Sequence, residues 1–212
     1  MNIQKIIIIF ILLLYIVRPA FSDITFEGTN NEIVILTGDI KAEEFDEILS
    51  EIKLNKPTQM ILDSYGGNDH SARRLAKHIH DNDISTYVSG VSICESACAL
   101  IFLAGKKRLC EGVLGVHQAV LPKDIGNEDI DLNFAMKYIQ EDIGNLIELL
   151  NDFDTPPFVY PHMLKTFDMY HFSKEEIAQI NTVMSLDEMW CLSYYNVQIL
   201  FLHIKVYYSM IY

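Results

Sequence analysis

The segment QMILDSYGGN, residues 59–68, carries the pattern that decides the fold. Residues 60–62 form a short apolar run that is typical of a buried strand, and Gly66 and Gly67 follow as a turn signal. Residues 72–79 then place apolar side chains at i, i+3, i+4 and i+7, the spacing of an amphipathic helix. This order predicts a strand, a glycine turn and a helix.

The same strand and helix unit recurs on both sides of this segment. Upstream, residues 32–36 predict a strand and residues 42–52 a helix that ends before Pro57. Downstream, residues 84–88 predict a strand and residues 94–105 an apolar helix. Repeated strand and helix units with short loops indicate a parallel sheet with right-handed crossovers.

Two polar residues lie at the ends of such elements. Ser96 lies near the start of the apolar helix, where free backbone NH groups and the positive end of the helix dipole would stabilise an oxyanion. His117 ends another apolar run, residues 113–116, and reactive groups collect at the C-terminal ends of parallel strands. With the glycine turn, these positions suit a serine nucleophile site. Each feature alone also fits an ordinary turn, a helix N-cap or a structural histidine.

Three motifs summarise these positions: DSYGGN at 63–68, CESAC at 94–98 and GVHQ at 115–118. Together they resemble the Clp-type serine peptidases of the ClpP/crotonase superfamily, and more closely the exported, single-domain relatives of those peptidases. The resemblance covers roughly residues 32–185. It implies an α/β fold, a stacked β-α superhelix with a mainly parallel sheet flanked by helices.

The resemblance also implies roles for individual residues. Ser96 would attack a carbonyl group as the nucleophile, and His117 would act as its general base. The oxyanion-hole NH groups would come from Gly66 or Gly67 and from Ala97. We therefore expect a serine hydrolase, specifically a peptidase, that works without a metal or another cofactor.

The sequence has no carboxylate at the position where the resemblance would place the third residue of a catalytic triad. The family places an aspartate shortly before a helix with a Ser-x-x-Glu start, which is a capping-box pattern and stands here at residues 173–176. The matching position falls near Lys165, whereas the nearest carboxylate belongs to Asp168. Asp168 is therefore the candidate third member. The alternative is a serine and histidine dyad that a backbone carbonyl orients.

The N-terminus has the pattern of a secretory signal peptide. Lys5 precedes the apolar run of residues 6–17, and small residues follow at Ala20 and Ser22. Cleavage after Ser22 would make residues 1–22 the signal peptide and the protein periplasmic or extracellular. An uncleaved N-terminal membrane anchor is the alternative.

The remainder is expected to hold one domain, residues 23–185, because 212 residues with 50% hydrophobic composition suffice for one sizeable core. Residues 186–212 form an apolar extension without a clean period of 2 or 3.6. Docking on the domain, burial between subunits and contact with a membrane all stay open for this extension.

The cysteines gather around the proposed nucleophile. Cys94, Cys98 and Cys110 lie within seventeen residues of one another, and Cys191 lies near the C-terminus. In an exported protein disulfides persist, so we expect a disulfide that braces the turn at Ser96, with the pairing left open. A zinc site made of the three clustered cysteines and His117, or a cysteine nucleophile paired with that histidine, fits the pattern less well.

Charge and composition limit the classes of molecule that the protein is expected to bind. A formal net charge of −13 disfavours nucleic acid and anionic lipid. The chain contains no ATPase motif, and the resemblance implies a peptide or protein substrate and a homo-oligomer.

The main alternative function is a catalytically inactive member of the same fold that serves as a peptide-binding, ligand-binding or assembly module. The unmatched carboxylate and the bulky Tyr65 beside the glycine pair favour this alternative. An acyl-CoA crotonase would use a similar oxyanion hole without a serine nucleophile. Export argues against it, because coenzyme A chemistry is cytosolic.

Overall fold

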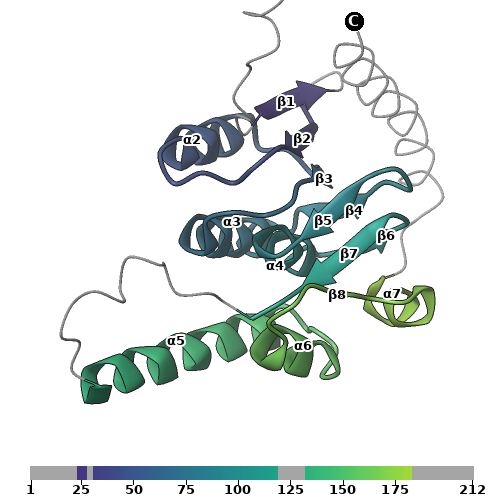
Figure 1. Cartoon of the computed structure of the whole chain (residues 1–212). Coiled ribbons are helices and arrows are strands. Elements are labelled where there is room, and N and C mark those ends of the chain that lie inside the picture. Colours follow the sequence, from purple (N-terminus) through teal and green to yellow (C-terminus); the bar gives the residue numbers. More distant parts are fainter. Residues whose placement is uncertain (1–22, 28–30, 119–131, 183–212) are drawn as a thin grey trace, which may run out of the picture.

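A computed structural model describes residues 23–27, 31–118 and 132–182 of the 212-residue chain. The expected signal peptide, residues 1–22, and the apolar extension, residues 186–212, lie outside the described residues. Within the described ranges the chain forms two sheets with helices packed around them (Figure 1).

Five strands form the main sheet, and their bounds are β1 (Asp23–Glu27), β2 (Ile33–Thr37), β3 (Gln59–Asp63), β4 (Ser85–Val88) and β6 (Arg108–Cys110). Their spatial order is β1-β2-β3-β4-β6. β2, β3, β4 and β6 run parallel to one another, and β1 pairs antiparallel with β2 at one edge. β2, β3 and β4 are buried along almost their whole length, which is expected of parallel strands covered on both faces.

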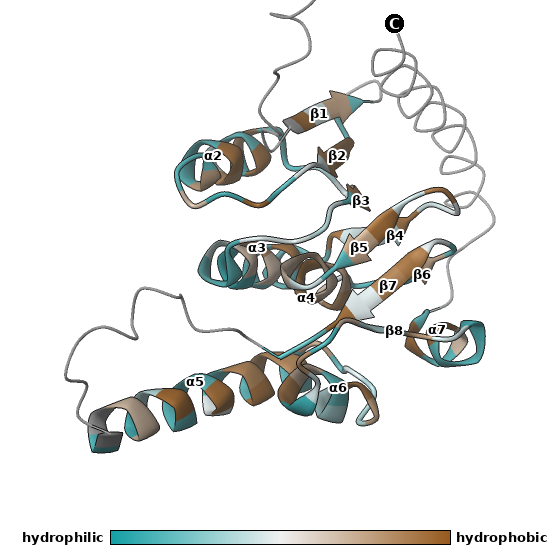
Figure 2. Cartoon of the chain, viewed as in Figure 1, coloured by the Kyte–Doolittle hydropathy of each residue, from teal (hydrophilic) through white to brown (hydrophobic). Residues whose placement is uncertain are grey.

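The helices are α2 (Phe45–Asn55), α3 (Asp69–Asp81), α4 (Ala97–Leu103), α5 (Leu132–Asp152), α6 (Val159–Lys165) and α7 (Lys174–Ile180). The largest core cluster joins helix residues such as Ile52 and Leu75 to strand residues such as Leu62. Figure 2 shows the strands mainly in the brown of hydrophobic residues, whereas α3 carries much teal. The amphipathic helix predicted after the glycine turn is confirmed as α3.

A second, smaller sheet consists of β5 (Ile93–Glu95), β7 (Val113–Val116) and β8 (Tyr170–His171). β5 runs parallel to β7, and β8 pairs antiparallel with β7. β5 corrects the helix predicted for residues 94–105. Residues 93–95 pair with β7 instead, so the helix begins only at Ala97.

The predicted fold class is confirmed, because the structure is a mixed α/β fold whose main sheet is mostly parallel and flanked by helices. None of the helices in the described ranges combines the length and the apolar character that crossing a bilayer requires.

Arg108 in β6 fastens the edge of the main sheet to two helix ends. Its side chain is almost fully buried and donates to the carbonyl oxygens of Leu103 at 2.6 Å, Phe153 at 2.8 Å and Asp154 at 3.3 Å. The first carbonyl ends α4 and the other two follow α5. Burial lowers the pKa of Arg108, and its guanidinium supplies a donor to the buried carbonyl groups of Leu103 and Phe153.

Replacing this guanidinium should destabilise the fold strongly. We expect Arg108→Met to lower the free energy of unfolding by about 3 kcal/mol, because it leaves buried carbonyl oxygens without donors. Lys106→Met is the matched control. It removes an exposed ion pair with Asp83 and should change the same quantity by less than about 1 kcal/mol. Denaturant unfolding measures both, and equal effects would contradict the proposed role of Arg108.

Candidate active site

Ser96 stands between a strand and a helix in an uncommon backbone conformation. It directly follows β5 and precedes α4, and its φ and ψ angles are 55° and −124°. Its NH donates to the carbonyl of Gly115 at 2.9 Å, while its own carbonyl accepts from Ala99 at 3.0 Å. A positive φ in a residue other than glycine costs about 1–3 kcal/mol. Such a strained strand-to-helix turn exposes the serine hydroxyl in the nucleophile elbow of α/β-hydrolases.

The hydroxyl of Ser96 meets the imidazole of His117. Ser96 Oγ lies 2.7 Å from His117 Nε2. The two residues directly follow β5 and β7, which are neighbouring strands of the second sheet. Ser96 makes no side-chain cap hydrogen bond to α4, so the reading of this residue as a plain N-cap does not hold. A hydroxyl within this distance of a ring nitrogen can pass its proton to that nitrogen, which general-base activation requires.

The glycine turn packs directly against this serine. Gly66 and Gly67 have φ angles of 98° and 139°, which glycine adopts without strain. A Cβ atom at position 66 would lie 2.8 Å from Ser96 Cβ, and one at position 67 would lie 2.3 Å from the carbonyl oxygen of Ile40. The two glycines are therefore needed both for the turn and for the close approach of three chain segments.

The three predicted oxyanion donors differ in availability. The NH of Gly66 donates to Ser64 Oγ at 3.0 Å. The NH groups of Gly67 and Ala97 donate to no acceptor among the described residues. Ala97 directly follows Ser96, and Gly67 directly follows Gly66, which packs against Ser96.

A disulfide joins the two cysteines on either side of Ser96. Cys94 bonds to Cys98 with a Cα–Cα distance of 5.2 Å, and both side chains are fully buried. Of the pairings left open by the sequence, the structure shows this one. It occupies the two thiols that the zinc and cysteine-nucleophile alternatives need. Cys110 is a buried free thiol whose pKa is raised by burial to about 12, and no cluster in the described ranges holds three or more potential metal ligands.

Among the described residues, no carboxylate bonds to the other ring nitrogen of His117. Nδ1 of His117 is buried and has no hydrogen-bond partner among the described residues. Asp168 is exposed in the segment between α6 and β8, and no hydrogen bond joins its carboxylate to the histidine. This segment does run beside the histidine, because Gln118 donates its NH to the carbonyl of Thr166 at 2.8 Å. The capping box predicted at residues 173–176 is confirmed at the start of α7.

A second histidine and carboxylate pair lies next to the site and was missed by sequence reasoning. His171 Nε2 lies 2.6 Å from Glu95 Oε1, and the two side chains meet across Gly115 in the middle strand. A Cβ at position 115 would lie 2.9 Å from His171 Cδ2, so only glycine leaves room for the pair. The pair ties β8 to the strand that leads into Ser96. Nothing in the linear sequence couples residues that lie 76 positions apart.

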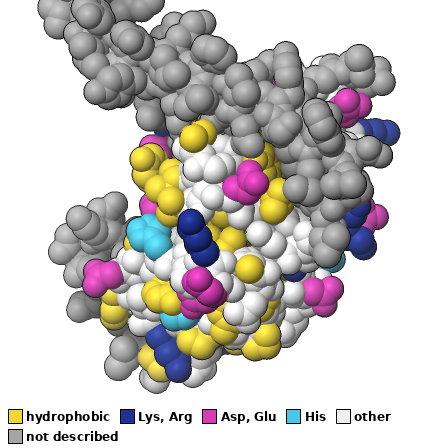
Figure 3. Space-filling model, turned by 90° about the vertical axis from the view of Figure 1, so that its right-hand side faces the viewer, with side chains coloured by type: hydrophobic (Ala, Val, Ile, Leu, Met, Phe, Trp, Pro, Cys, Tyr) yellow, Lys and Arg dark blue, Asp and Glu magenta, His cyan; other side chains and the backbone are white. Residues whose placement is uncertain are grey.

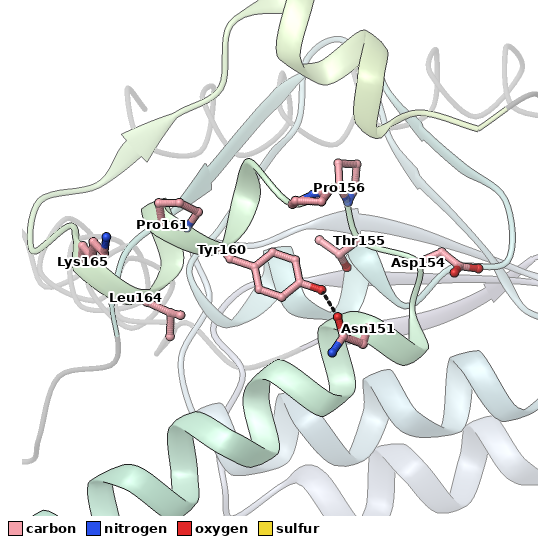
Figure 4. Close-up of a pocket in the computed structure, with 9 residues that line it drawn as sticks. Asn151, Asp154, Thr155, Pro156, Tyr160, Pro161, Leu164 and Lys165 are labelled. Carbon is pink, nitrogen blue, oxygen red and sulfur yellow. Dashed lines mark hydrogen bonds between the residues drawn. The ribbon is translucent and has the colours of Figure 1, made fainter.

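The described residues also line two pockets. One of about 660 Å³ opens between the end of α5 and α6, where Tyr160 donates to Asn151 Oδ1 at 2.7 Å (Figure 4). Neither Ser96 nor His117 lines it. A pocket of about 530 Å³ adjoins the glycine turn and includes the exposed side chains of Tyr65, Val91 and Val113. Ser96 and His117 do not line this second pocket either.

Comparison with known proteins supports the fold. No protein-family model matches the chain, and no curated protein sequence matches it. Among solved structures, the chain is similar to a serine-to-alanine mutant of 1510-N, described as a membrane-bound stomatin-specific protease. The TM-score is 0.51 and the sequence identity 14%, over 73% of this chain and 80% of that chain. At this identity the likeness shows a shared fold, and it agrees with the ClpP-like fold that the sequence motifs predict.

Proposed function

We propose that this chain is an exported serine hydrolase that acts as a peptidase, with Ser96 as nucleophile and His117 as general base. The contact of 2.7 Å between Ser96 Oγ and His117 Nε2 carries the proposal. The positive φ of Ser96 and the unused NH groups of Gly67 and Ala97 support it, because each provides a part that acyl transfer needs.

The reaction proceeds by acyl transfer. Ser96 Oγ attacks the carbonyl carbon of the substrate while its proton moves to His117 Nε2. The developing oxyanion accepts hydrogen bonds from the NH groups of Gly67 and Ala97, and each such donor is worth about 3 kcal/mol in other enzymes. His117 then protonates the leaving amine. A water molecule repeats the cycle and releases the acyl group from the serine.

A polypeptide is the proposed substrate. The structural neighbour is a protease, and the pocket beside the glycine turn offers apolar side chains for recognition. Figure 3 shows acidic, basic and hydrophobic side chains interspersed on one face of the molecule, which suits a polypeptide better than a polyanion. The N-terminal apolar run and the disulfide support export to an oxidising compartment. A homo-oligomer is part of the proposal on the strength of the motifs alone.

One observation favours a second candidate function, a catalytically inactive module that binds peptides. The unpartnered Nδ1 of His117 leaves the imidazole without the acceptor that normally fixes its tautomer. Without that acceptor, the site would hold a peptide without cleaving it.

A fluorophosphonate probe, which reacts with activated serines, separates the two functions. We expect the wild-type chain to be labelled and Ser96→Ala to remain unlabelled. His117→Ala should slow labelling at least about 100-fold, because the general base is lost. Mass spectrometry locates the label, and circular dichroism confirms that each variant is folded. A folded wild type that resists the probe would leave the binding module as the function.

The exposure of Asp168 leads to a separate expectation. Asp168→Asn should change the labelling rate by less than about threefold, whereas loss of a true triad aspartate costs about 10⁴-fold in kcat. Asp154→Asn, which changes another carboxylate outside the dyad, is the matched control. A loss of more than tenfold in the Asp168 variant alone would place that carboxylate in the catalytic site after all.

The disulfide should matter more to the nucleophile than to the fold. It closes a very short loop, so its contribution to stability through chain entropy is about 2 kcal/mol. It nevertheless brackets the strained turn at Ser96. We therefore expect Cys94→Ala with Cys98→Ala to remain folded at 25 °C and to be labelled at least about tenfold more slowly. Cys110→Ala, which removes a buried free thiol, is the control, and unchanged labelling of the double variant would argue against a bracing role.

A further inference from the structure

The middle strand of the second sheet leaves space for two polar side chains beside the nucleophile. Gly115 in β7 stands between Glu95 in β5 and His171 in β8. A Cβ atom at position 115 would lie 2.9 Å from His171 Cδ2 and 3.1 Å from Glu95 Cγ. Gly115 does not have a positive φ, so its backbone does not itself require glycine. What requires glycine at this position is the space that the two side chains occupy.

The contact between these two side chains is a charge-assisted hydrogen bond. An ionised carboxylate only accepts, so His171 Nε2 donates to Glu95 Oε1, at 2.6 Å. The side chain of Glu95 is 13% exposed and that of His171 is 51% exposed. A pair with one half-exposed partner adds little to global stability. Its effect is therefore expected to be local, at the residues that Glu95 joins.

The backbone of Glu95 contacts both the glycine turn and the nucleophile. Its NH donates to the carbonyl of Ser64 at 3.1 Å, in the segment that leads to the turn. Its carbonyl oxygen lies 2.7 Å from the position that a Cβ of Gly66 would take. Its peptide bond to Ser96 carries the NH that donates to Gly115 at 2.9 Å. The φ angle of Ser96 is the torsion that starts at the carbonyl carbon of Glu95, so a displacement of Glu95 changes that angle directly.

His171 holds the other end of the pair in the segment beside the general base. β8 pairs antiparallel with β7, the strand that leads into His117. Upstream of β8, Thr166 accepts at 2.8 Å from the NH of Gln118, the residue that follows His117. The pair therefore joins the strand that ends at the nucleophile to the segment that runs beside the histidine.

We propose that Glu95 and His171 are positioning residues, whose hydrogen bond across Gly115 fixes the peptide before Ser96 and keeps the serine in its strained conformation. A positive φ outside glycine persists only where the surrounding contacts hold it. This inference rests on the proposed function, since it concerns Ser96 as the nucleophile. In acyl transfer a small displacement of a reacting group costs a large part of the rate.

The neighbouring residue in β8 offers a matched control. Tyr170 also bonds to a carboxylate, donating to Glu176 Oε1 at 2.9 Å. Successive side chains of a strand point to opposite faces, so this bond reaches the first turn of α7 and not the strand before Ser96. Tyr170→Phe therefore removes one hydrogen bond from the same strand and leaves the pair of Glu95 and His171 intact.

Amide hydrogen exchange, followed by NMR, tests the proposal without depending on activity. We expect Glu95→Ala and His171→Ala each to speed exchange of the Ser96 NH at least about tenfold. The double variant should speed it no further, because both single variants lose the same bond. Tyr170→Phe should leave the rate within about twofold of wild type, and the amides of β2 and β3 should stay as slow as in wild type in every variant. Wild-type exchange of the Ser96 NH in Glu95→Ala would overturn the proposal.

Labelling by the fluorophosphonate probe tests the consequence for reactivity. We expect Glu95→Ala to lower the maximal labelling rate at least about tenfold, with little change in the probe concentration that gives half of that rate. Glu95→Gln keeps an oxygen acceptor for His171, so it should recover most of the rate, and as a nearly isosteric change it also serves if the alanine variant fails to fold. A wild-type rate in Glu95→Ala, or an equal loss in Tyr170→Phe, would overturn the proposal.

The two measurements separate failure of this proposal from failure of the proposed function. A wild type that resists the probe, with exchange at Ser96 that responds to Glu95→Ala as expected, would refute the hydrolase and retain the pair as the restraint on the turn. A labelled wild type whose exchange at Ser96 ignores Glu95→Ala would retain the hydrolase and refute the positioning role.

Discussion

The positive φ angle of Ser96 is the constraint on which the candidate site depends. A strand paired to β7 ends at this residue and a helix begins directly after it, so the whole change of direction occurs at one α-carbon. The hydrogen bonds of its NH to Gly115 and of its carbonyl to Ala99 fix the peptide planes on both sides. With the backbone held in this way, the hydroxyl points across the second sheet to His117 instead of capping the helix.

The glycines follow from the same constraint. Gly66 lies so close to Ser96 that a side chain there would collide with the Cβ atom of Ser96 and with the backbone nitrogen of Ala97. Gly67 is similarly close to the backbone of Ile40, which donates its NH to the carbonyl of Gly66 and accepts from Asn68. The turn is therefore packed between the start of α4 on one side and the segment after β2 on the other. Among the described residues, the NH of Gly67 donates to no acceptor, unlike the NH of Gly66.

Much of this arrangement could be predicted from the sequence because it depends on local patterns. Apolar runs, a glycine pair and helical spacing were enough to predict the parallel units and to place Ser96 and His117 at the ends of elements. The second sheet was not predictable, because β5 spans only Ile93–Glu95 and its residues also continue an apolar helical pattern. The contact of Glu95 with His171 is long-range, and the choice of Cys98 over Cys110 as the partner of Cys94 depends on where β6 lies. The backbone strain at Ser96 leaves no mark in residue identity, since serine is not the residue that favours a positive φ.

That strain also bears on which function the fold serves. A natural domain is stable by about 5–15 kcal/mol, so a backbone conformation that costs about 1–3 kcal/mol is a sizeable fraction of the total. A binding module would gain nothing from it, because a glycine at the same position would adopt the turn without strain and would bind a peptide backbone equally well. A nucleophile needs both the turn and a hydroxyl at its apex. The combination of strain and hydroxyl at Ser96 therefore favours the proposed acyl transfer over the alternative of binding alone.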